Sequence, residues 1–228
     1  MRITDNVELF ELDGKYGILN SVLVWDDKDV VLIDTGLPEQ LELIRNAVEK
    51  TGFSLERITK IILTHLDEDH VGCAKHLREL GAEIMAHEKE VPYIQGDSVS
   101  PKLLAMAERL RSATEEELAY YASVQEAAPK MFVHVDRVLK DGEALPFCGG
   151  IEVIHTPGHT PGHISLLLKS GNILVTGDAA NASDGILTGP NPEYTLDMPK
   201  AQESFEKLKK LNPDFIICYH GGVLRFKK

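Results

Sequence analysis

IILTHLDEDHVG, residues 61–72, joins an apolar run to a strongly polar turn. The β-branched run at 61–63 predicts a buried strand, which ends where four candidate metal ligands fall within six residues. A helix is expected to begin just after the turn, because apolar residues recur at helical spacing from Val71 onward. The positive end of such a helix favours ionised carboxylates, so the turn is suited to binding a cation. The four candidates are His65, Asp67, Asp69 and His70.

Three further polar motifs follow expected strands later in the chain. TPGHTPGH covers residues 156–163, TGD covers 176–178 and CYHGG covers 218–222. One histidine after a strand is weak evidence of a metal site, since the chain has nine histidines. The joint pattern is informative, because the four loops would converge if their strands end on one edge of a sheet. Ordinary structural or surface roles are expected for the histidines outside the motifs: His76, His87, His134 and His155.

Length and composition indicate a globular chain. At 228 residues, with 43% hydrophobic and 26% charged residues, it is long enough to bury a sizeable core. We expect a single domain over residues 1–228. A formal net charge of −12 argues against a nucleic-acid partner, because phosphate binding requires clustered Lys and Arg. The basic residues at 225–228 are better explained as a solvated end.

The same composition indicates the compartment. No apolar run approaches the length needed to span a bilayer, so no membrane partner is expected. The N-terminal residues lack the charged and then apolar pattern of a signal peptide. Three scattered cysteines are too few for a disulfide framework and fit a reducing compartment. The sequence therefore predicts a cytoplasmic protein.

The rest of the chain alternates between expected strands and helices. Between residues 30 and 86 the order is strand, helix, strand, helix, strand, which predicts helices packed outside a sheet. Strands are expected at 10–12, 17–25, 30–33, 61–63, 84–86, 131–138, 152–154, 164–168, 173–175 and 215–218, with helices from 38 to 52, from about 70 to 80 and from about 199 to 211.

Residues 92–130 interrupt this alternation. Apolar residues at 103, 104, 107 and 110 fit helical spacing, and the Thr-Glu-Glu-Glu run at 114–117 has the pattern of a capping box that opens a second helix. We interpret the segment as an insertion over the active-site end, where lids and dimer contacts commonly arise. A homodimer through this insertion is one expectation, a lid is another, and a surface hairpin without a role in substrate choice is the third.

In this order, from about Asp34 to the end of the chain, the motifs resemble those of the metallo-β-lactamase-fold hydrolase superfamily. The first signature of that family is His-x-His-x-Asp-His after a strand, and Asp67 stands at its second His. The resemblance implies an α+β fold, the four-layer αββα sandwich, and a dinuclear metal centre. It assigns His65, Asp67 and His159 to one metal and Asp69, His70 and His220 to the other, with Asp178 bridging.

The resemblance also implies residues that support the ligands or meet the substrate. Asp34, in Asp-Thr-Gly after a strand, is expected to hydrogen-bond to ligands, although it would serve equally as a helix cap. His163 is expected to have a structural role beside the ligands. Asn181 stands where the similar lactonases carry a Tyr, and its amide is able to donate to a substrate carbonyl. Tyr194 is expected in a substrate-facing loop, although loop structure alone would explain it.

Two divalent metals in such a site would hold a hydroxide between them and polarise the scissile bond. Asp69 is the expected catalytic residue, because a free carboxylate oxygen would orient that hydroxide or shuttle its proton. Asp67 in place of His makes the centre electrically neutral and gives a site of two His and one carboxylate, a set that suits iron or manganese. Zinc stays the default expectation. An alternative is that Asp67 ligates nothing and only one metal binds.

The expected reaction is hydrolysis of an ester, lactone or thioester of a small metabolite, as in the lactonases and glyoxalase-II-like thioesterases of the superfamily. The chain ends soon after His220, so the helical domain with which glyoxalase II binds glutathione is not expected. The alternatives are an iron-dependent redox enzyme similar to persulfide dioxygenases or flavodiiron proteins, a phosphodiesterase, and a metal-containing binder without activity. Residues 92–130 and 181–198 would set the substrate, and neither carries a motif.

Overall fold

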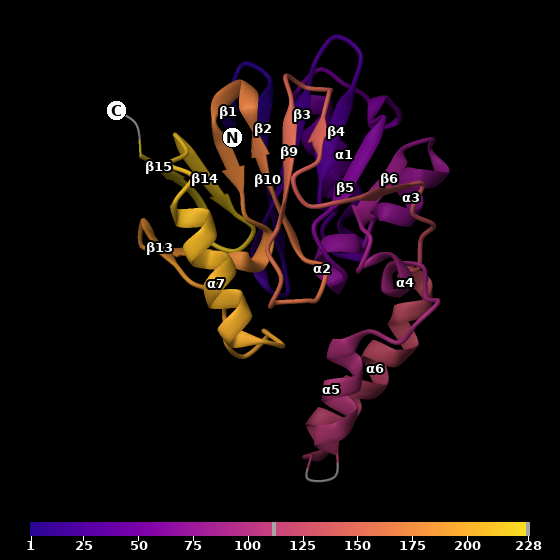
Figure 1. The fold of residues 1–228 in the computed structure, drawn as a ribbon. Coiled ribbons are helices and arrows are strands. Elements are labelled where there is room, and N and C mark those ends of the chain that lie inside the picture. Colours follow the sequence, from indigo (N-terminus) through magenta and orange to yellow (C-terminus); the bar gives the residue numbers. More distant parts are fainter. Residues whose placement is uncertain (111–112, 227–228) are drawn as a thin grey trace.

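Two β-sheets lie face to face with helices on both outer sides, which is the predicted αββα sandwich (Figure 1). The structure is a computed structural model that describes residues 1–110 and 113–226. Residues 227–228 of the predicted solvated end lie outside the described residues. None of the helices in the described part of the chain has the length and apolar character needed to cross a bilayer.

The first sheet has seven strands in sequence order, antiparallel from β1 to β4 and parallel from β4 to β7. Its strands are β1 (Arg2–Thr4), β2 (Val7–Gly14), β3 (Gly17–Trp25), β4 (Val30–Ile33), β5 (Lys60–Leu63), β6 (Glu83–His87) and β7 (Arg137–Leu139). The parallel part confirms the strand and helix alternation predicted between residues 30 and 86.

The second sheet has six strands, of which β11 and β14 pair in parallel and the other neighbours in antiparallel fashion. Its spatial order is β15 (Gly222–Arg225), β14 (Phe215–Cys218), β11 (Ile173–Val175), β10 (Ile164–Leu168), β9 (Ile151–His155) and β8 (Ala144–Leu145). A separate hairpin is formed by β12 (Asn181–Ser183) and β13 (Ile186–Thr188). The short strands β1, β8, β12, β13 and β15 were not predicted from the sequence.

Helices cover the outer face of each sheet. Buried residues of α1 and α3 pack on the first sheet, and Phe205 and Leu208 of α7 pack on the second. The α-helices are α1 (Leu41–Lys50), α2 (Glu68–Val71), α3 (Ala74–Glu79), α4 (Val91–Ile94), α5 (Pro101–Arg109), α6 (Glu115–Met131) and α7 (Met198–Lys209). Short 3-10 turns are η1 (Pro38–Gln40), η2 (Leu55–Arg57), η4 (Lys169–Gly171) and η5 (Gly177–Ala179).

The strand β4 shows why the central strands are apolar at every position. Val31 and Ile33 face the second sheet, and Val30 and Leu32 face the helices. All four side chains are buried, because each face of the strand is covered by another layer. The same alternation in β5 places Ile62 between the sheets and Ile61 and Leu63 under the helices. These strands are therefore fixed in register by two cores at once.

The helix expected just after the turn at 65–70 is divided into α2 and α3, and Gly72 lies at the division. The Gly72 amide donates to the carbonyl of Gly36 at 2.9 Å. A Cβ on Gly72 would lie 2.4 Å from that carbonyl oxygen and from the backbone of Leu37. The absence of a side chain thus lets α2 pack directly against the loop that follows β4, the loop that begins with Asp34.

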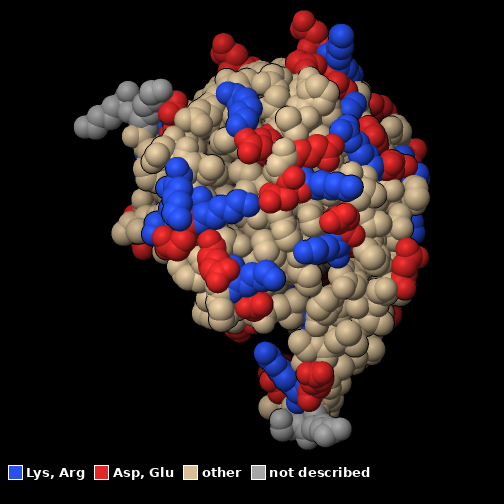
Figure 2. Space-filling view, in the orientation of Figure 1, with Lys and Arg blue, Asp and Glu red and all other residues tan. Residues whose placement is uncertain are grey.

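The insertion forms the predicted pair of helices, α5 and α6, which project from the body of the sandwich (Figure 1). The predicted capping box is confirmed, since the Glu117 amide donates to Thr114 Oγ1 at 3.2 Å and the Thr114 amide donates to Glu117 Oε2 at 2.7 Å. The visible surface of this hairpin is mostly uncharged (Figure 2). Leu104, Leu118 and Tyr120 are among its exposed side chains. The homodimer contact stays a prediction.

The strand predicted at 131–138 is wrong for most of its length. Met131 is the last residue of α6, and β7 begins only at Arg137. Val133 and Val135, the alternating apolar residues in between, are buried. Their amides donate to residues at the end of α4 and not to a neighbouring strand. The Val133 amide donates to the Ile94 carbonyl at 3.1 Å, and the Val135 amide donates to the Gln95 side chain at 2.9 Å. Tertiary packing therefore explains the alternation.

We expect Gly72→Ala to lower the free energy of unfolding by about 1–3 kcal/mol, the range for overpacking a site that has no free space. Gly189→Ala is the matched control, because a Cβ there would meet its nearest neighbours at 3.6–3.8 Å, an ordinary contact distance. Denaturant unfolding of both variants measures the difference. Equal stabilities for the two variants would contradict the close approach of α2 to the loop after β4.

Candidate metal centre

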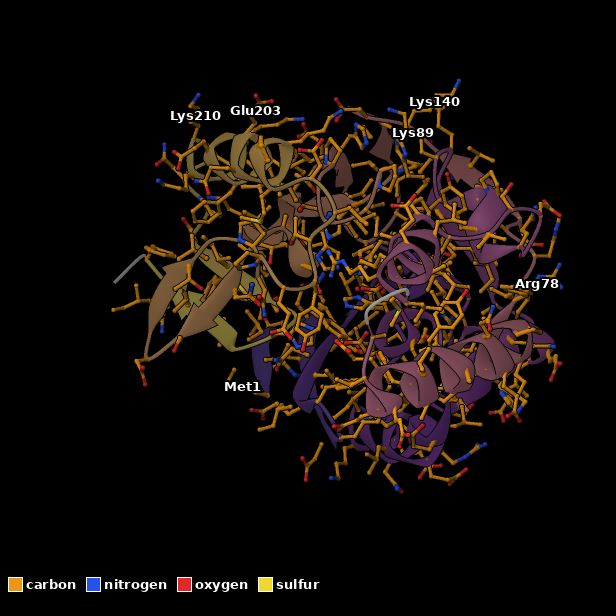
Figure 3. All side chains as sticks on the ribbon, turned by 90° about the horizontal axis from the view of Figure 1, so that it is seen from below. Met1, Arg78, Lys89, Lys140, Glu203 and Lys210 are labelled. Carbon is orange, nitrogen blue, oxygen red and sulfur yellow. The ribbon has the colours of Figure 1, made fainter. Side chains whose placement is uncertain are left out.

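The loops that carry the predicted ligands meet at one edge of the sandwich, the edge seen from below in Figure 3. Each loop directly follows a strand, β5, β9, β11 or β14. The labelled charged residues Arg78, Lys89, Lys140, Glu203 and Lys210 lie at the periphery of this view and point outward (Figure 3). The candidate ligand side chains, by contrast, are buried or half-buried.

Backbone hydrogen bonds join the two sheets at this edge. The Ile164 amide of β10 donates to the carbonyl of Thr64, just after β5, at 3.0 Å. The Asn20 amide of β3 donates to the carbonyl of Tyr219, just after β14, also at 3.0 Å. The site is consequently held at the ends of strands from both sheets and does not depend on long flexible loops.

The first cluster contains two histidines and two aspartates. Its ligand atoms all lie within 4.8 Å of one another. Asp67 Oδ2 is 3.1 Å from His65 Nε2 and 3.1 Å from His159 Nε2. The fourth member, Asp178, approaches His159 Nε2 with its Oδ2 at 3.4 Å.

The second cluster consists of Asp69, His70 and His220, whose ligand atoms also lie within 4.8 Å of one another. Asp69 Oδ2 is 3.4 Å from His220 Nε2 and 3.8 Å from His70 Nε2. Asp178 reaches this cluster too, because its Oδ1 is 3.3 Å from His70 Nε2 and its Oδ2 is 3.6 Å from His220 Nε2. Asp178 thus lies between the clusters, as expected of a bridging ligand, and all seven predicted ligands are brought together.

Buried atoms without hydrogen-bond partners show that the site fits metal ions. Within residues 1–110 and 113–226, His65 Nε2, His70 Nε2 and Asp178 Oδ1 are buried and have no hydrogen-bond partner. Buried polar atoms in native proteins are nearly always paired, so three unpaired atoms in one place require an explanation. Imidazole nitrogen and carboxylate oxygen are the donor atoms that zinc and the related divalent ions bind. Bound cations would satisfy all three atoms.

Neighbouring groups control the protonation of the histidines. Burial, together with His70, lowers the pKa of His65 to about 4, so its ring is neutral and able to ligate. Burial opposes a charge on His220, but hydrogen bonds to Asp178 and Asp69 raise its pKa to about 9. Despite its burial, the pKa of His70 is raised well above its usual value by Asp34, Asp178 and Asp69. Without metal, protons thus balance the carboxylates of the second cluster.

Asp34 orients His70 from behind the second cluster. Its backbone is left-handed, with φ of 57°, which turns the carboxylate inward after β4. Asp34 accepts hydrogen bonds from the Thr64 amide and the Thr64 hydroxyl, both at 2.8 Å, and lies 2.8 Å from His70 Nδ1. This contact directs Nε2 of His70 toward the cluster, as expected for a group that fixes the tautomer of a ligand.

His163 has the supporting position that the sequence predicted. Its Nε2 accepts a hydrogen bond from the Asp178 amide at 2.9 Å, and its Nδ1 lies 2.9 Å from the Thr156 hydroxyl. Both ring nitrogens are therefore used within the protein. The role of His163 is to hold the backbone of the loop that carries Asp178.

The predicted substrate residues lie in the loop between β11 and α7. The Asn181 side-chain NH₂ donates to the Gly189 carbonyl at 3.2 Å, so one of its two N–H donors braces the loop. Tyr194 is 60% exposed. Its neighbour Thr195 lies 3.5 Å from His159 Nδ1 through its hydroxyl. The loop therefore contacts the first cluster, and a direct role of Asn181 or Tyr194 in substrate binding stays a prediction.

Sequence reasoning missed Glu90, a buried carboxylate just before α4. It accepts hydrogen bonds from the Leu66 amide at 2.9 Å, the Thr160 hydroxyl at 2.7 Å and the Gly162 amide at 2.7 Å. These donors lie on the loops that carry His65 and His159. Burial raises the pKa of Glu90 while the hydrogen bonds oppose that shift. No motif marks Glu90, so only the fold reveals that it links ligand loops of both sheets.

Tyr219 was also missed, although it lies within the motif that contains His220. Its ring packs against His70 with centroids 3.8 Å apart, and its hydroxyl donates to the Asp69 carbonyl. Burial raises the pKa of the Tyr219 hydroxyl well above its usual value. The neutral phenol therefore serves as a wall of the second cluster and a fixed donor to α2.

The third missed residue is Lys102, which reaches the first cluster from α5. Its ammonium donates to Asp67 Oδ2 and lies 2.7 Å from His159 Nε2. Burial alone would raise the pKa of Asp67, but Lys102 and His65 hold it well below its usual value. The amphipathic spacing that predicted the helix gave no sign that one of its polar residues enters the site.

Residues 15–220 match the model of the metallo-beta-lactamase superfamily. The chain belongs to that superfamily. A probable metallo-hydrolase of Bacillus subtilis, YflN, is 32% identical over 84% of this chain and 75% of its own length. The hydroxyacylglutathione hydrolase GloC of Haemophilus influenzae is 28% identical over 89% of this chain and 85% of its own length. These relatives support a metal-dependent hydrolase of the metallo-beta-lactamase superfamily.

Solved structures of the superfamily share the fold. The metallo-beta-lactamase family protein TTHA1429 of Thermus thermophilus superposes with a TM-score of 0.71, covering 98% of this chain and 76% of its own, at 22% sequence identity. At this identity the likeness concerns the fold alone. It agrees with the αββα sandwich and confirms the fold class predicted from the motifs.

We expect Glu90→Gln to destabilise the protein by about 1–3 kcal/mol, the cost of leaving a buried donor unsatisfied. The NH₂ group of the new side chain would face either the Leu66 amide or the Thr160 hydroxyl and the Gly162 amide, and neither backbone amide can accept a hydrogen bond from it. Glu88→Gln, at an exposed position two residues away, is the control. Thermal unfolding measures stability, and bound metal after dialysis reports on the loops. A Glu90→Gln variant as stable as the control would refute this role.

Metal binding at pH 7 should release protons from the second cluster, because metal ligation requires neutral imidazoles. His220, with a pKa of about 9, keeps its proton at pH 7 in the metal-free protein and loses it as the pH rises through 9. Affinity for zinc should therefore increase with pH up to about 9. Calorimetry in buffers of different ionisation enthalpy counts the protons, and heats that are independent of the buffer would contradict the expectation.

Proposed function

We propose that the chain hydrolyses an ester, lactone or thioester of a small metabolite, using two divalent metal ions held by the two clusters. The observation that carries the proposal is Asp178, whose carboxylate lies within 3.6 Å of histidines of both clusters, while buried nitrogens of His65 and His70 have no hydrogen-bond partner within the described residues. The similarity to a hydroxyacylglutathione hydrolase supports acyl chemistry. The limited identity leaves the substrate itself to experiment.

The ligand sets follow the geometry. His65, Asp67 and His159 would hold one ion, and Asp69, His70 and His220 the other, with Asp178 shared. Ions bound there would lower the pKa of a water and polarise the scissile carbonyl, so no side-chain nucleophile is required. The protein contributes the fixed arrangement, since Asp34 and His163 orient a ligand each.

Asp69 is the proposed proton carrier. Its main-chain carbonyl accepts a hydrogen bond from the buried Tyr219 hydroxyl, which fixes this residue of α2. Its side chain is 13% exposed, and its Oδ2 lies 3.4 Å from His220 Nε2. A carboxylate in this position is able to take a proton from the attacking water and deliver it to the leaving group.

We propose zinc as the metal, with Asp67 as a ligand. The neutral His65 and the ionised Asp67 together with His159 form a set of two His and one carboxylate, which is common in catalytic zinc sites. The same set is typical of non-haem iron, so the presence of Asp67 favours an iron-dependent redox enzyme as the second candidate. Metal analysis and the visible spectrum after anaerobic purification separate the two candidates.

The formal net charge of −12 favours a small molecule over a nucleic acid as the substrate. On the visible face, Lys and Arg alternate with Asp and Glu and form no continuous basic area (Figure 2). Nucleic-acid binding requires such an area, so a phosphodiesterase for nucleic acids fits less well. We propose that the protein is cytoplasmic. The free thiols of Cys73, Cys148 and Cys218 support this proposal, because they fit a reducing compartment.

The test combines metal analysis with a hydrolysis screen of lactones, thioesters and phosphodiesters. The protein is expected to hold about two equivalents of divalent metal and to hydrolyse at least one acyl substrate. His65→Ala should lower that activity by about a hundredfold or more, because it removes a buried ligand of the first cluster. His76→Ala, at an exposed histidine outside the motifs, is the control. Turnover unchanged in His65→Ala would refute the mechanism.

A further inference from the structure

Lys102 enters the first cluster from a well-defined helix start. Pro101 is the first residue of α5, and the Ser100 side chain caps the helix by accepting from the Leu103 amide at 3.2 Å. Lys102 is therefore in the first turn, where its backbone is fixed by the cap and the proline. Its side chain is 22% exposed, and the rest is buried on the way to the cluster.

The contacts of Lys102 involve two of the proposed ligands of the first metal. The ammonium donates to Asp67 Oδ2, and the distance from Nζ to His159 Nε2 is 2.7 Å. An ammonium has three donors and no acceptor, so His159 must offer the lone pair of Nε2 in this contact. That lone pair is the one that His159 would give to a metal.

The second cluster has a different environment. The ion pairs of Asp69, His70 and His220 are formed with one another and with Asp34 and Asp178. In these pairs the partners of the carboxylates are histidines. At the first cluster, by contrast, the Lys102 ammonium, which comes from a separate helix, lies against the ligand atoms. The two clusters are thus unequal.

We propose that Lys102 is an internal cation that competes with metal for the first cluster, so that the two clusters fill in order, second before first. The inference rests on the ligand sets proposed above. A metal that takes the lone pair of His159 Nε2 must displace the ammonium from that nitrogen, because an imidazole nitrogen has only one lone pair. Filling the first cluster therefore breaks the contact of Lys102 with His159 and places a second cation beside the ammonium, so metal binding and the position of Lys102 are coupled in both directions.

This coupling gives the α5–α6 hairpin a defined relation to the metal site. The Lys102 contact reaches the cluster from α5, a helix that has no buried residue of its own. With the first cluster empty, the ammonium keeps the start of α5 over Asp67. With the cluster filled, the start of α5 is free to move. Lys102 would thus adjust both the metal content and the position of the hairpin.

The test measures zinc binding alone, in a background that isolates the first cluster. His220→Ala removes a ligand of the second cluster, and Lys102→Met is added to remove the charge while keeping a long unbranched side chain. In calorimetric titration, the double variant should bind Zn²⁺ with an affinity about tenfold higher, or more, than that of His220→Ala alone. This is the size of effect expected when one charge-assisted contact is lost. Lys102→Arg, which retains a cation, should not gain affinity. Lys130→Met, on the exposed part of α6, is the matched control.

Hydrogen exchange supplies a readout that does not depend on affinity. In the otherwise unaltered protein, added zinc should increase the exchange of amides in residues 101–109, because the Lys102 contact is broken. In Lys102→Met these amides should exchange fast with or without zinc. Circular dichroism of each variant verifies that it is folded.

Three outcomes are distinguishable. Higher zinc affinity in Lys102→Met, together with zinc-dependent exchange in the unaltered protein, supports the competition. Equal zinc affinities of the Lys102→Met and Lys130→Met variants overturn the proposed competition but leave the proposed ligand sets intact. Failure of zinc to bind to any of these proteins overturns both the competition and the proposed ligand sets.

Discussion

Hydrogen bonds across the gap between the two sheets are the constraint on which the site depends. Its predicted ligands directly follow β5 in one sheet and β9, β11 and β14 in the other. A sandwich packed through apolar side chains alone leaves small sliding motions between its sheets inexpensive. The backbone bond from Ile164 to Thr64 and the Glu90 carboxylate prevent such sliding at this edge. A shift of one sheet would break them and separate His65 from His159.

The second constraint is electrostatic, because several carboxylates share a site with little water. Asp67, Asp69 and Asp178 would repel one another if nothing balanced their charge. In the metal-free protein the balance comes from protonated histidines in one cluster and from Lys102 in the other. The carboxylates therefore have cationic partners in both clusters, and metal ions held by the same atoms would take over that balancing role.

The sequence predicted the parts of the fold that depend on local pattern. Apolar runs located the central strands, and the capping box at Thr114 located α6, because these signals lie in neighbouring residues. The joint motifs also brought together the seven ligands, since each motif directly follows a strand. The failures have one physical origin. Hydrogen bonds to residues far away in sequence determine the backbone at 131–138 and the roles of Glu90 and Lys102. The local spacing of apolar and polar residues carries no information about such distant partners.

The position of the α5–α6 hairpin in the connection between β6 and β7 has a consequence for how the protein diversifies. Parallel pairing of β6 with β7 is complete without these helices, and the hairpin projects beyond the sandwich. Exchanges in the projecting part of the hairpin that keep Lys102 and Met131 therefore leave both cores and the contacts of Asp67 and His159 in place. Descendants of one ancestral scaffold are free to vary this module, and an engineer who grafts a different hairpin between the same two strands is using the same freedom.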